Sequence, residues 1–328
     1  MSKFLNTIWF WLKAARVHTM PMSFMSWLVV FCISFKHGGN IFLGLLALIG
    51  VMLAHLGVNL TDDYFDYKRE VGTIKSSDEK KSIKMQKGKC AYLINGETTI
   101  DKVLLVCFIY FGLASLIGAF LLFTCGWQVL VIAAIAAILC ISYPFLTYCG
   151  LSEFAVGMTF APLLFAGVSF VMLGYFSKDI LLLSLSTGLL TIGLLHTHAL
   201  MDYDFDLKDN KKTLCILAGS KQNALIVLGI MMAIAYINIG VGVYLHIFPL
   251  SYLLTFLTIY LPLGLYRLMD LGIKHPEIVP TRKFWMGPME NWADIEKNNA
   301  QSFMLKFYIS RNIMVFFTVM LCLGILVG

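Results

Sequence analysis

The chain has 328 residues, of which 59% are hydrophobic and only 13% are charged. Soluble domains carry about 25% charged residues and cannot bury so much apolar surface, so the composition predicts that lipid is the main solvent. This excludes a cytosolic enzyme, a disordered chain, a nucleic-acid-binding module and a small secreted scaffold. The apolar runs are continuous and do not alternate, which excludes an outer-membrane barrel.

Nine apolar runs approach the length that a bilayer-spanning helix requires, about 20 residues. The eight cysteines are scattered without a CxxC pair, and we interpret them as small hydrophobic residues. The sequence therefore predicts an all-α, polytopic transmembrane bundle of about nine helices that forms a single domain over residues 1–328. In chain order the runs are 17–35, 41–61, 103–124, 127–146, 152–175, 180–201, 222–245, 247–270 and 305–327.

The basic residues predict the orientation of this bundle. With a cytoplasmic N-terminus, the connections at about 62–102, 202–221 and 271–304 form cap loops on the inner side. Of the 25 Lys and Arg residues, only Lys36 and Lys178 then fall in outer connections, as the positive-inside rule expects. We therefore expect a multi-pass protein of the inner (cytoplasmic) membrane with its functional side toward the cytoplasm. The net charge of +6 fits anionic lipid or an anion site and needs no nucleic acid.

The first cluster of acidic residues lies at the end of the second run, where the chain reads NLTDDYFDYKRE (59–70). Asn59, Asp63 and Asp66 stand at positions i, i+4 and i+7, so one face of a helix carries all three. Lys68 follows Asp66 by two residues.

A second cluster lies at the end of the sixth run, in MDYDFDLKDNKKTL (201–214). Asp202, Asp206 and Asp209 repeat the same spacing, and Lys208 follows Asp206 by two residues. Because the second and sixth runs are four apart in chain order, both helices point the same way and both clusters belong to the same side of the membrane.

Carboxylates near hydrocarbon are costly unless they are paired, solvated or bound to a cation. Mg²⁺ prefers oxygen ligands and is typically held by a few carboxylates together with substrate phosphates, so the two clusters predict a site for a Mg²⁺-diphosphate. The alternative of a different class is a secondary transporter that uses the aspartates as an ion pathway. The lysines after the acids favour a diphosphate, and a CDP-alcohol phosphotransferase is disfavoured because its DGxxAR pattern is missing.

The segment DDYFD (62–66) is similar to the DDxxD motif of enzymes that bind prenyl diphosphates through Mg²⁺. With NxxxDxxD in one span and DxxxD four spans later, the chain resembles the UbiA superfamily of intramembrane aromatic prenyltransferases from about residue 10 to 325. The segments KAARVHTMP (13–21), NLTDDYFDYKREVGT (59–73) and DLKDNKKTL (206–214) are most similar to the branch that prenylates 1,4-dihydroxy-2-naphthoate in menaquinone biosynthesis.

This resemblance implies Mg²⁺-dependent transfer of a polyprenyl group from a polyprenyl diphosphate to an aromatic small molecule, with membrane lipid around the prenyl tail. It implies that Asp63 and Asp66 hold one Mg²⁺ and that Asp202 and Asp206 hold the other, while Asn59 orients the first pair. Basic residues would bind the remaining diphosphate oxygens, and the candidates are Arg16, Lys68, Lys208, Lys211 and Lys212.

The chain departs from the branch at two places. Thr147 and Cys149 stand where members carry a basic residue near Tyr148, and His198 lies where an asparagine pair and an arginine are common. These changes leave other acceptors open, such as 4-hydroxybenzoate or homogentisate.

Several residues keep two interpretations. His55 and His198 each precede a cluster by four residues. Each is interpreted either as a hydrogen-bonded residue of the bundle or as a group that supports a metal ligand or accepts a proton. Trp285, Trp292 and Glu290 indicate either a loop lid or an interfacial anchor. Four aromatic residues are interpreted either as neighbours of an allylic cation or as core residues. They are Tyr64, Phe65, Tyr143 and Tyr148.

Overall fold

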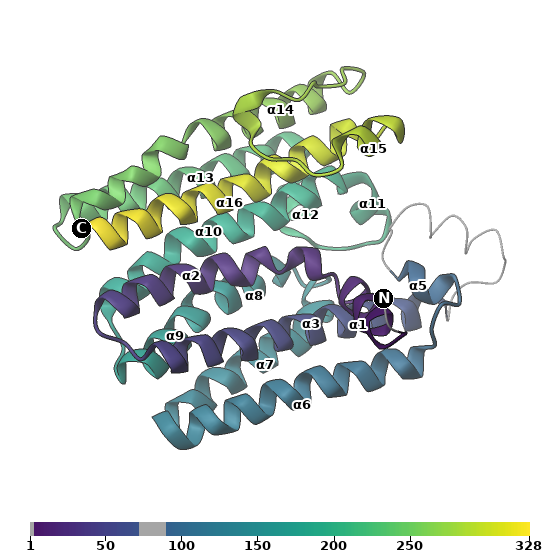
Figure 1. The fold of residues 1–328 in the computed structure, drawn as a ribbon. Helices are drawn as coiled ribbons and strands as arrows, with labels where there is room; N and C mark the ends of the chain where they lie inside the picture. The colour runs from purple at the N-terminus through teal and green to yellow at the C-terminus, as the bar shows by residue number, and fades with distance from the viewer. Residues whose placement is uncertain (1–2, 72–89) are drawn as a thin grey trace. The chain divides into compact units, whose positions relative to one another are not determined.

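The computed structural model describes residues 3–71 and 90–328 of the chain, and Figure 1 traces its helices. In this part of the chain all regular elements are helices, and nine segments are long and apolar enough to cross a membrane, which confirms the predicted all-α bundle. The largest difference from the predicted runs is in the second span, which covers Ile41–Lys68 and does not end at residue 61.

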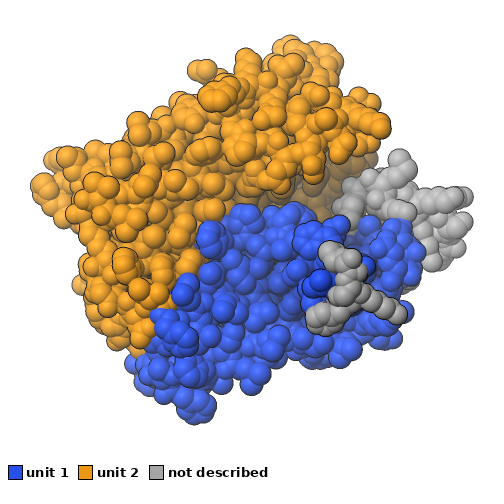
Figure 2. Space-filling view, in the orientation of Figure 1, with its two compact units in different colours: residues 1–24, 42–144 blue, residues 25–41, 145–328 orange. Residues whose placement is uncertain are grey.

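Two compact units make up the chain, and Figure 2 colours them blue and orange. The single domain over residues 1–328 and the cytoplasmic N-terminus stay predictions. The cap loop expected at 62–102 lies partly outside the described residues, because these leave out 72–89.

Unit 1 contains residues 1–24 and 42–144. Its longest helix, α3, has 31 residues and is therefore about 46 Å long, whereas the hydrocarbon core of a bilayer is about 30 Å thick. The end of α3 that carries the first cluster consequently extends beyond the apolar part of the span. The elements of unit 1 are α1 (Lys3–Ala14), η1 (Val17–Thr19), the start of α2 (Pro21–Lys36), α3 (Ile41–Val71), α5 (Ala91–Ile94), α6 (Ile100–Cys125) and most of α7 (Gln128–Leu146).

Close packing holds α3 against its neighbours in unit 1. A Cβ atom added at Gly57 would lie 3.0 Å from the Phe111 ring of α6, so the absence of a side chain lets the two helices approach. Near the middle of α3, Leu56 and Leu60 share a buried apolar cluster with Ala15, which follows α1. This cluster fixes the turn between α1 and η1 beside α3, and the turn carries Arg16.

Unit 2 contains residues 25–41 and 145–328, and α10 lies at its centre in contact with α8, α13 and α16. Polar side chains join α10 to α13 inside the span: Ser186 Oγ donates to Ala235 O at 2.8 Å, and Asn238 Nδ2 donates to Ser186 Oγ at 2.9 Å. Its further elements are α8 (Ser152–Met158), η2 (Thr159–Leu163), α9 (Leu164–Leu173), α10 (Lys178–Met201), α11 (Tyr203–Lys208), α12 (Leu214–Leu217), α13 (Lys221–Tyr244), η3 (Leu250–Thr258), α14 (Tyr260–Lys274), η4 (Phe284–Met286), α15 (Trp292–Lys297) and α16 (Gln301–Val327).

Candidate active site

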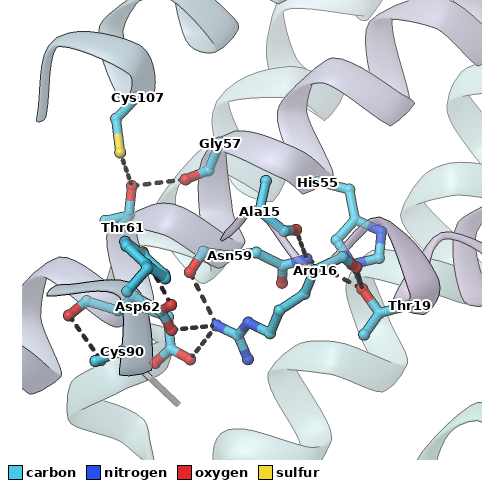
Figure 3. A network of polar contacts seen from close by, with 12 residues as sticks. Ala15, Arg16, Thr19, His55, Gly57, Asn59, Thr61, Asp62, Cys90 and Cys107 are labelled. Atoms are coloured by element: carbon cyan, nitrogen blue, oxygen red, sulfur yellow. Dashed lines mark hydrogen bonds and ion pairs between the residues drawn. The ribbon is translucent and has the colours of Figure 1, made fainter. Parts of the chain in front are cut away.

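The first acidic cluster lies on the last turns of α3, where Asp62 and Asp63 are both buried. Arg16 meets them from the turn after α1: its Nη2 lies 2.9 Å from Asp62 Oδ2 and 2.9 Å from Asp63 Oδ1, and it also donates to Asn59 O at 2.8 Å. Arg16 has a φ of 56°, in the left-handed region that is uncommon for residues other than glycine. This turn directs the guanidinium toward the carboxylates, as Figure 3 shows.

The charges in this cluster are balanced by contact. Burial alone would lower the pKa of Arg16, but the carboxylates of Asp63 and Asp62 outweigh it and raise the pKa above its ordinary value. Because Arg16 is a base whose pKa is raised, it stays protonated at every working pH. The contribution of its positive charge to the stability of the fold is therefore complete at any pH below the ordinary pKa of arginine. Tyr92 on α5 donates its hydroxyl hydrogen to Asp63 Oδ2 at 3.1 Å, and the pKa of this phenol is raised first by burial and then by the Asp63 charge.

Asn59 holds the turn that carries Arg16. Its Nδ2 donates to Ala15 O at 2.9 Å and to Thr19 Oγ1 at 3.0 Å, and Thr19 Oγ1 lies 3.3 Å from His55 Nε2 (Figure 3). The other ring nitrogen of His55, Nδ1, lies 2.5 Å from Ser23 Oγ. These contacts are those of a hydrogen-bonded bundle histidine, the first of the two interpretations of His55.

The first cluster becomes more accessible toward the end of α3, where Asp66 is half-buried and Lys68 is exposed. The Nζ atom of Lys68 lies 5.0 Å from the centroid of the Tyr64 ring, so this ring contacts a basic side chain in the structure.

The second cluster surrounds the junction of α10 and α11. Asp202 ends α10 and is exposed, whereas Asp206 on α11 is buried. The N–H of Asp206 donates to Asp202 O at 2.9 Å, so helical hydrogen bonding continues across the junction and keeps the two carboxylates one turn apart. Lys211 Nζ donates to Asp206 Oδ1 at 2.6 Å. The remaining candidates, Lys208 and Lys212, are exposed.

A buried glutamate, to which no sequence motif assigned a role, holds this segment in place. Glu153 Oε1 on α8 accepts a hydrogen bond from the N–H of Leu214 at 2.9 Å, and Glu153 Oε2 accepts one from Ser152 Oγ at 2.7 Å. The N–H of Lys212 donates to Thr147 O at 2.9 Å. The segment 147–153, where the chain departs from the branch pattern, therefore contacts the loop that carries Lys211 and Lys212.

The remaining candidates lie in ordinary packing. His198 stacks on Phe307, with ring centroids 4.8 Å apart. Trp292 Nε1 donates to Glu296 Oε1 at 2.7 Å, and the Glu290 carboxylate lies 3.4 Å from Arg311 Nη1.

The donor chemistry of both clusters fits Mg²⁺, because each offers carboxylate oxygens at the end of a span. Within the described residues no three His, Cys, Asp or Glu side chains converge on one point. Mg²⁺ takes few protein ligands and completes its coordination with water and phosphate oxygens. Arg16 Nε is buried without a hydrogen-bond partner among the described residues, so the guanidinium can take a further acceptor oxygen.

Comparisons with known proteins agree with this fold. Residues 23–285 match the UbiA prenyltransferase family. The 1,4-dihydroxy-2-naphthoate octaprenyltransferase of Escherichia coli (strain K12) is 26% identical over 243 residues, which cover 70% of this chain and 76% of that protein.

Solved structures share the fold at low identity. A digeranylgeranylglyceryl phosphate synthase is 19% identical, with a TM-score of 0.59 over 96% of this chain and 98% of that one. A UbiA homologue from Aeropyrum pernix K1 is 13% identical, with a TM-score of 0.60 over 93% and 97%. A UbiA homologue from Archaeoglobus fulgidus, bound to GPP and Mg²⁺, is 15% identical, with a TM-score of 0.53 over 95% and 99%. This chain is therefore an integral, multi-pass membrane protein that belongs to the UbiA prenyltransferase family.

Proposed function

We propose that this protein transfers a polyprenyl group from a polyprenyl diphosphate to 1,4-dihydroxy-2-naphthoate, in the membrane and with Mg²⁺. The observation that carries the proposal is the pair of aspartate clusters, each at the end of a span and each with a basic partner in contact: Arg16 with Asp63, and Lys211 with Asp206. Family membership supports prenyl transfer, and the Escherichia coli relative supports the naphthoate acceptor.

The proposed metal ligands are Asp63 and Asp66 in the first cluster and Asp202 and Asp206 in the second. The Archaeoglobus homologue binds Mg²⁺ together with GPP or DMAPP, which supports the choice of metal and of substrate class. When bound, Mg²⁺ would neutralise the diphosphate and act as a Lewis acid on the leaving group.

The basic residues of this chain have two tasks in the proposal. Arg16 and Lys211 already neutralise buried carboxylates, and this lets Asp63 and Asp206 remain in the fold before a substrate arrives. Lys68, Lys208 and Lys212 are exposed and can donate charge-assisted hydrogen bonds to diphosphate oxygens. Asn59 acts through its hydrogen bonds to the turn that carries Arg16.

The proposal also includes the orientation of the site. The basic side of the bundle faces the cytoplasm in the inner membrane, where a soluble diphosphate headgroup reaches the clusters and the prenyl tail stays in lipid. This part rests on the positive-inside distribution of Lys and Arg.

The test is an assay of purified protein in vesicles with a polyprenyl diphosphate and an acceptor. We expect pyrophosphate release to require Mg²⁺. Asp63→Ala and Asp202→Ala should each lower the rate at least about 100-fold, because a lost metal contact removes several kcal/mol of transition-state stabilisation. Asp204→Ala is the matched control, since Asp204 is exposed on α11 and its partner Lys221 lies 2.6 Å away. Turnover without divalent metal, or full activity of both variants, would contradict the proposed site.

The acceptor is tested separately with 1,4-dihydroxy-2-naphthoate, 4-hydroxybenzoate and homogentisate in parallel. Mass spectrometry of the lipid extract identifies the acceptor that gained the prenyl group. We expect the naphthoate product, with loss of its carboxylate. Prenylation of only 4-hydroxybenzoate or homogentisate would overturn the acceptor but leave the metal site standing.

A further inference from the structure

The connection between α14 and α16, residues 275–300, does not stay at the end of the helices. Figure 1 shows it running back along α14 and α16 before it returns to α15. The innermost part of this excursion is η4 (Phe284–Met286), and all of it belongs to unit 2.

Contacts with both helices fix the depth of η4. The Trp285 ring packs on Gly264 of α14, where an added Cβ would clash with it, and Asn312 Nδ2 of α16 donates to Met286 O at 2.8 Å. Gly264 lies ten residues before Lys274, where its span ends, and Asn312 lies eleven residues after Gln301, where its span begins. The nearest charged residues are Arg267, which is exposed three residues after Gly264, and Arg311, which directly precedes Asn312. At 1.5 Å per residue, η4 therefore lies about 15 Å from the ends of the two spans, about 4.5 Å further into the bundle than Arg267 and at the level of Arg311.

Polar groups of α16 bind the non-helical backbone at this depth. Besides the bond to Met286 O, Asn312 Nδ2 lies 3.1 Å from Pro288 O, Arg311 Nη2 donates to Pro288 O at 3.1 Å, and Tyr308 Oη donates to Glu290 O at 3.1 Å. Irregular backbone is tolerated at membrane depth only where protein groups satisfy it, and intramembrane Arg and Asn need partners as well. The loop and α16 meet both requirements together, so the excursion is part of the packed structure.

One large apolar side chain of η4 remains outside this packing. Phe284 is fully exposed, with a relative exposure of 103%, whereas Met286 is buried. Trp285 covers the face of α14 on which Tyr260 and Leu263 are themselves exposed, at 45% and 56%. An exposed apolar face of a membrane span faces lipid, and the contact of Trp285 with Tyr260 joins η4, which carries Phe284, to this face.

We propose that residues 282–289 form a re-entrant membrane wedge, with Phe284 inserted among the acyl chains of one leaflet. Arg282 and Lys283 directly precede Phe284 and are both exposed, which suits contact with lipid phosphates while the aromatic residue enters the apolar layer. The partner of this surface is the bilayer. The inference does not depend on the proposed reaction.

Photocrosslinking tests the wedge in native membranes. The benzophenone amino acid p-benzoylphenylalanine replaces Phe284 in one variant and Asp294, which is exposed on α15, in a matched control. After irradiation, mass spectrometry should find phospholipid attached at position 284, with a yield at least several-fold higher than at position 294. A cross-link from position 284 mainly to another protein, to the rest of this chain or to an added prenyl diphosphate overturns the proposal, and so do equal lipid yields at both positions.

Fluorescence quenching provides a second and independent measurement. Phe284→Trp adds an indole at a fully exposed position, so the fold has no reason to change. In vesicles of brominated phosphatidylcholine, the emission that this variant gains over the unmodified protein should be quenched, whereas that gained by Asp294→Trp should not. Quenching of the position 284 indole by aqueous iodide and not by brominated lipid contradicts the wedge.

Discussion

Arg16 is the residue on which the first cluster depends in unit 1. Its side chain is 24% exposed and contacts two carboxylates whose side chains are 11% and 2% exposed. Buried carboxylates without a counter-charge are costly, so the guanidinium makes this pair of aspartates compatible with the folded unit. Asp62, to which the sequence analysis assigned no ligand role, is thus a structural partner of Arg16.

Arg16→Ala should therefore destabilise the protein by about 3 kcal/mol, the lower end of the range for a broken buried ion pair, because about a quarter of Arg16 is exposed. Thermal unfolding in one detergent, followed by circular dichroism, measures the effect. Lys102→Ala is the control, because Lys102 is exposed on α6 and its loss should change stability by less than about 0.5 kcal/mol.

A double substitution separates charge from packing at Arg16. If the loss comes from unbalanced carboxylates, Arg16→Ala combined with Asp62→Asn should be more stable than Arg16→Ala alone. An unchanged or additive loss would show that Arg16 contributes by filling space.

At the scale of elements, the two clusters are built differently. The first lies inside the continuous helix α3, so its spacing alone determines which side chains share a face. The second begins where α10 ends, and its loop with Lys211 and Lys212 depends on contacts from the segment before α8 and from α8 itself. The geometry of this second site is therefore determined by Glu153 as well as by its own residues.

Glu153→Ala should release the N-terminus of α12, because it removes the acceptor of the Leu214 N–H. We expect a fall in kcat of about 10- to 100-fold, since a hydrogen bond to a charged group contributes about 1.5–3 kcal/mol. Glu153→Gln retains an amide oxygen at the same place and should keep most of the activity.

Limited trypsin digestion gives a structural measurement of the same prediction. A released loop should be cut faster at Lys211 and Lys212 in Glu153→Ala than in the unmodified protein. Glu97→Ala is the control, because Glu97 is exposed and accepts a hydrogen bond from Asn95 two residues away. Loss of kcat with unchanged digestion would mean that Glu153 takes part in the chemistry itself.

At the scale of the whole molecule, periodic and compositional signals predicted the fold well. The apolar runs gave nine spans because hydrocarbon thickness imposes a minimum length on every one of them. The same signals do not predict contacts between residues far apart in the chain, such as Arg16 with Asp63 or Glu153 with Leu214. They also missed the excursion of η4, because FWM is too short to register as an apolar run.

The orientation of the molecule leads to the last prediction. The nine spans among the described residues predict termini on opposite sides of the membrane, and the Lys and Arg distribution predicts a cytoplasmic N-terminus. In Escherichia coli cells, a green fluorescent protein fused to the C-terminus should stay dark, whereas alkaline phosphatase fused there should be active. Fusions truncated after residue 220 should give the reverse, since 202–221 is expected inside. Because a change in the number of spans after residue 220 would alter the first result without altering the second, and an inverted molecule would alter both, the two fusions together separate these cases.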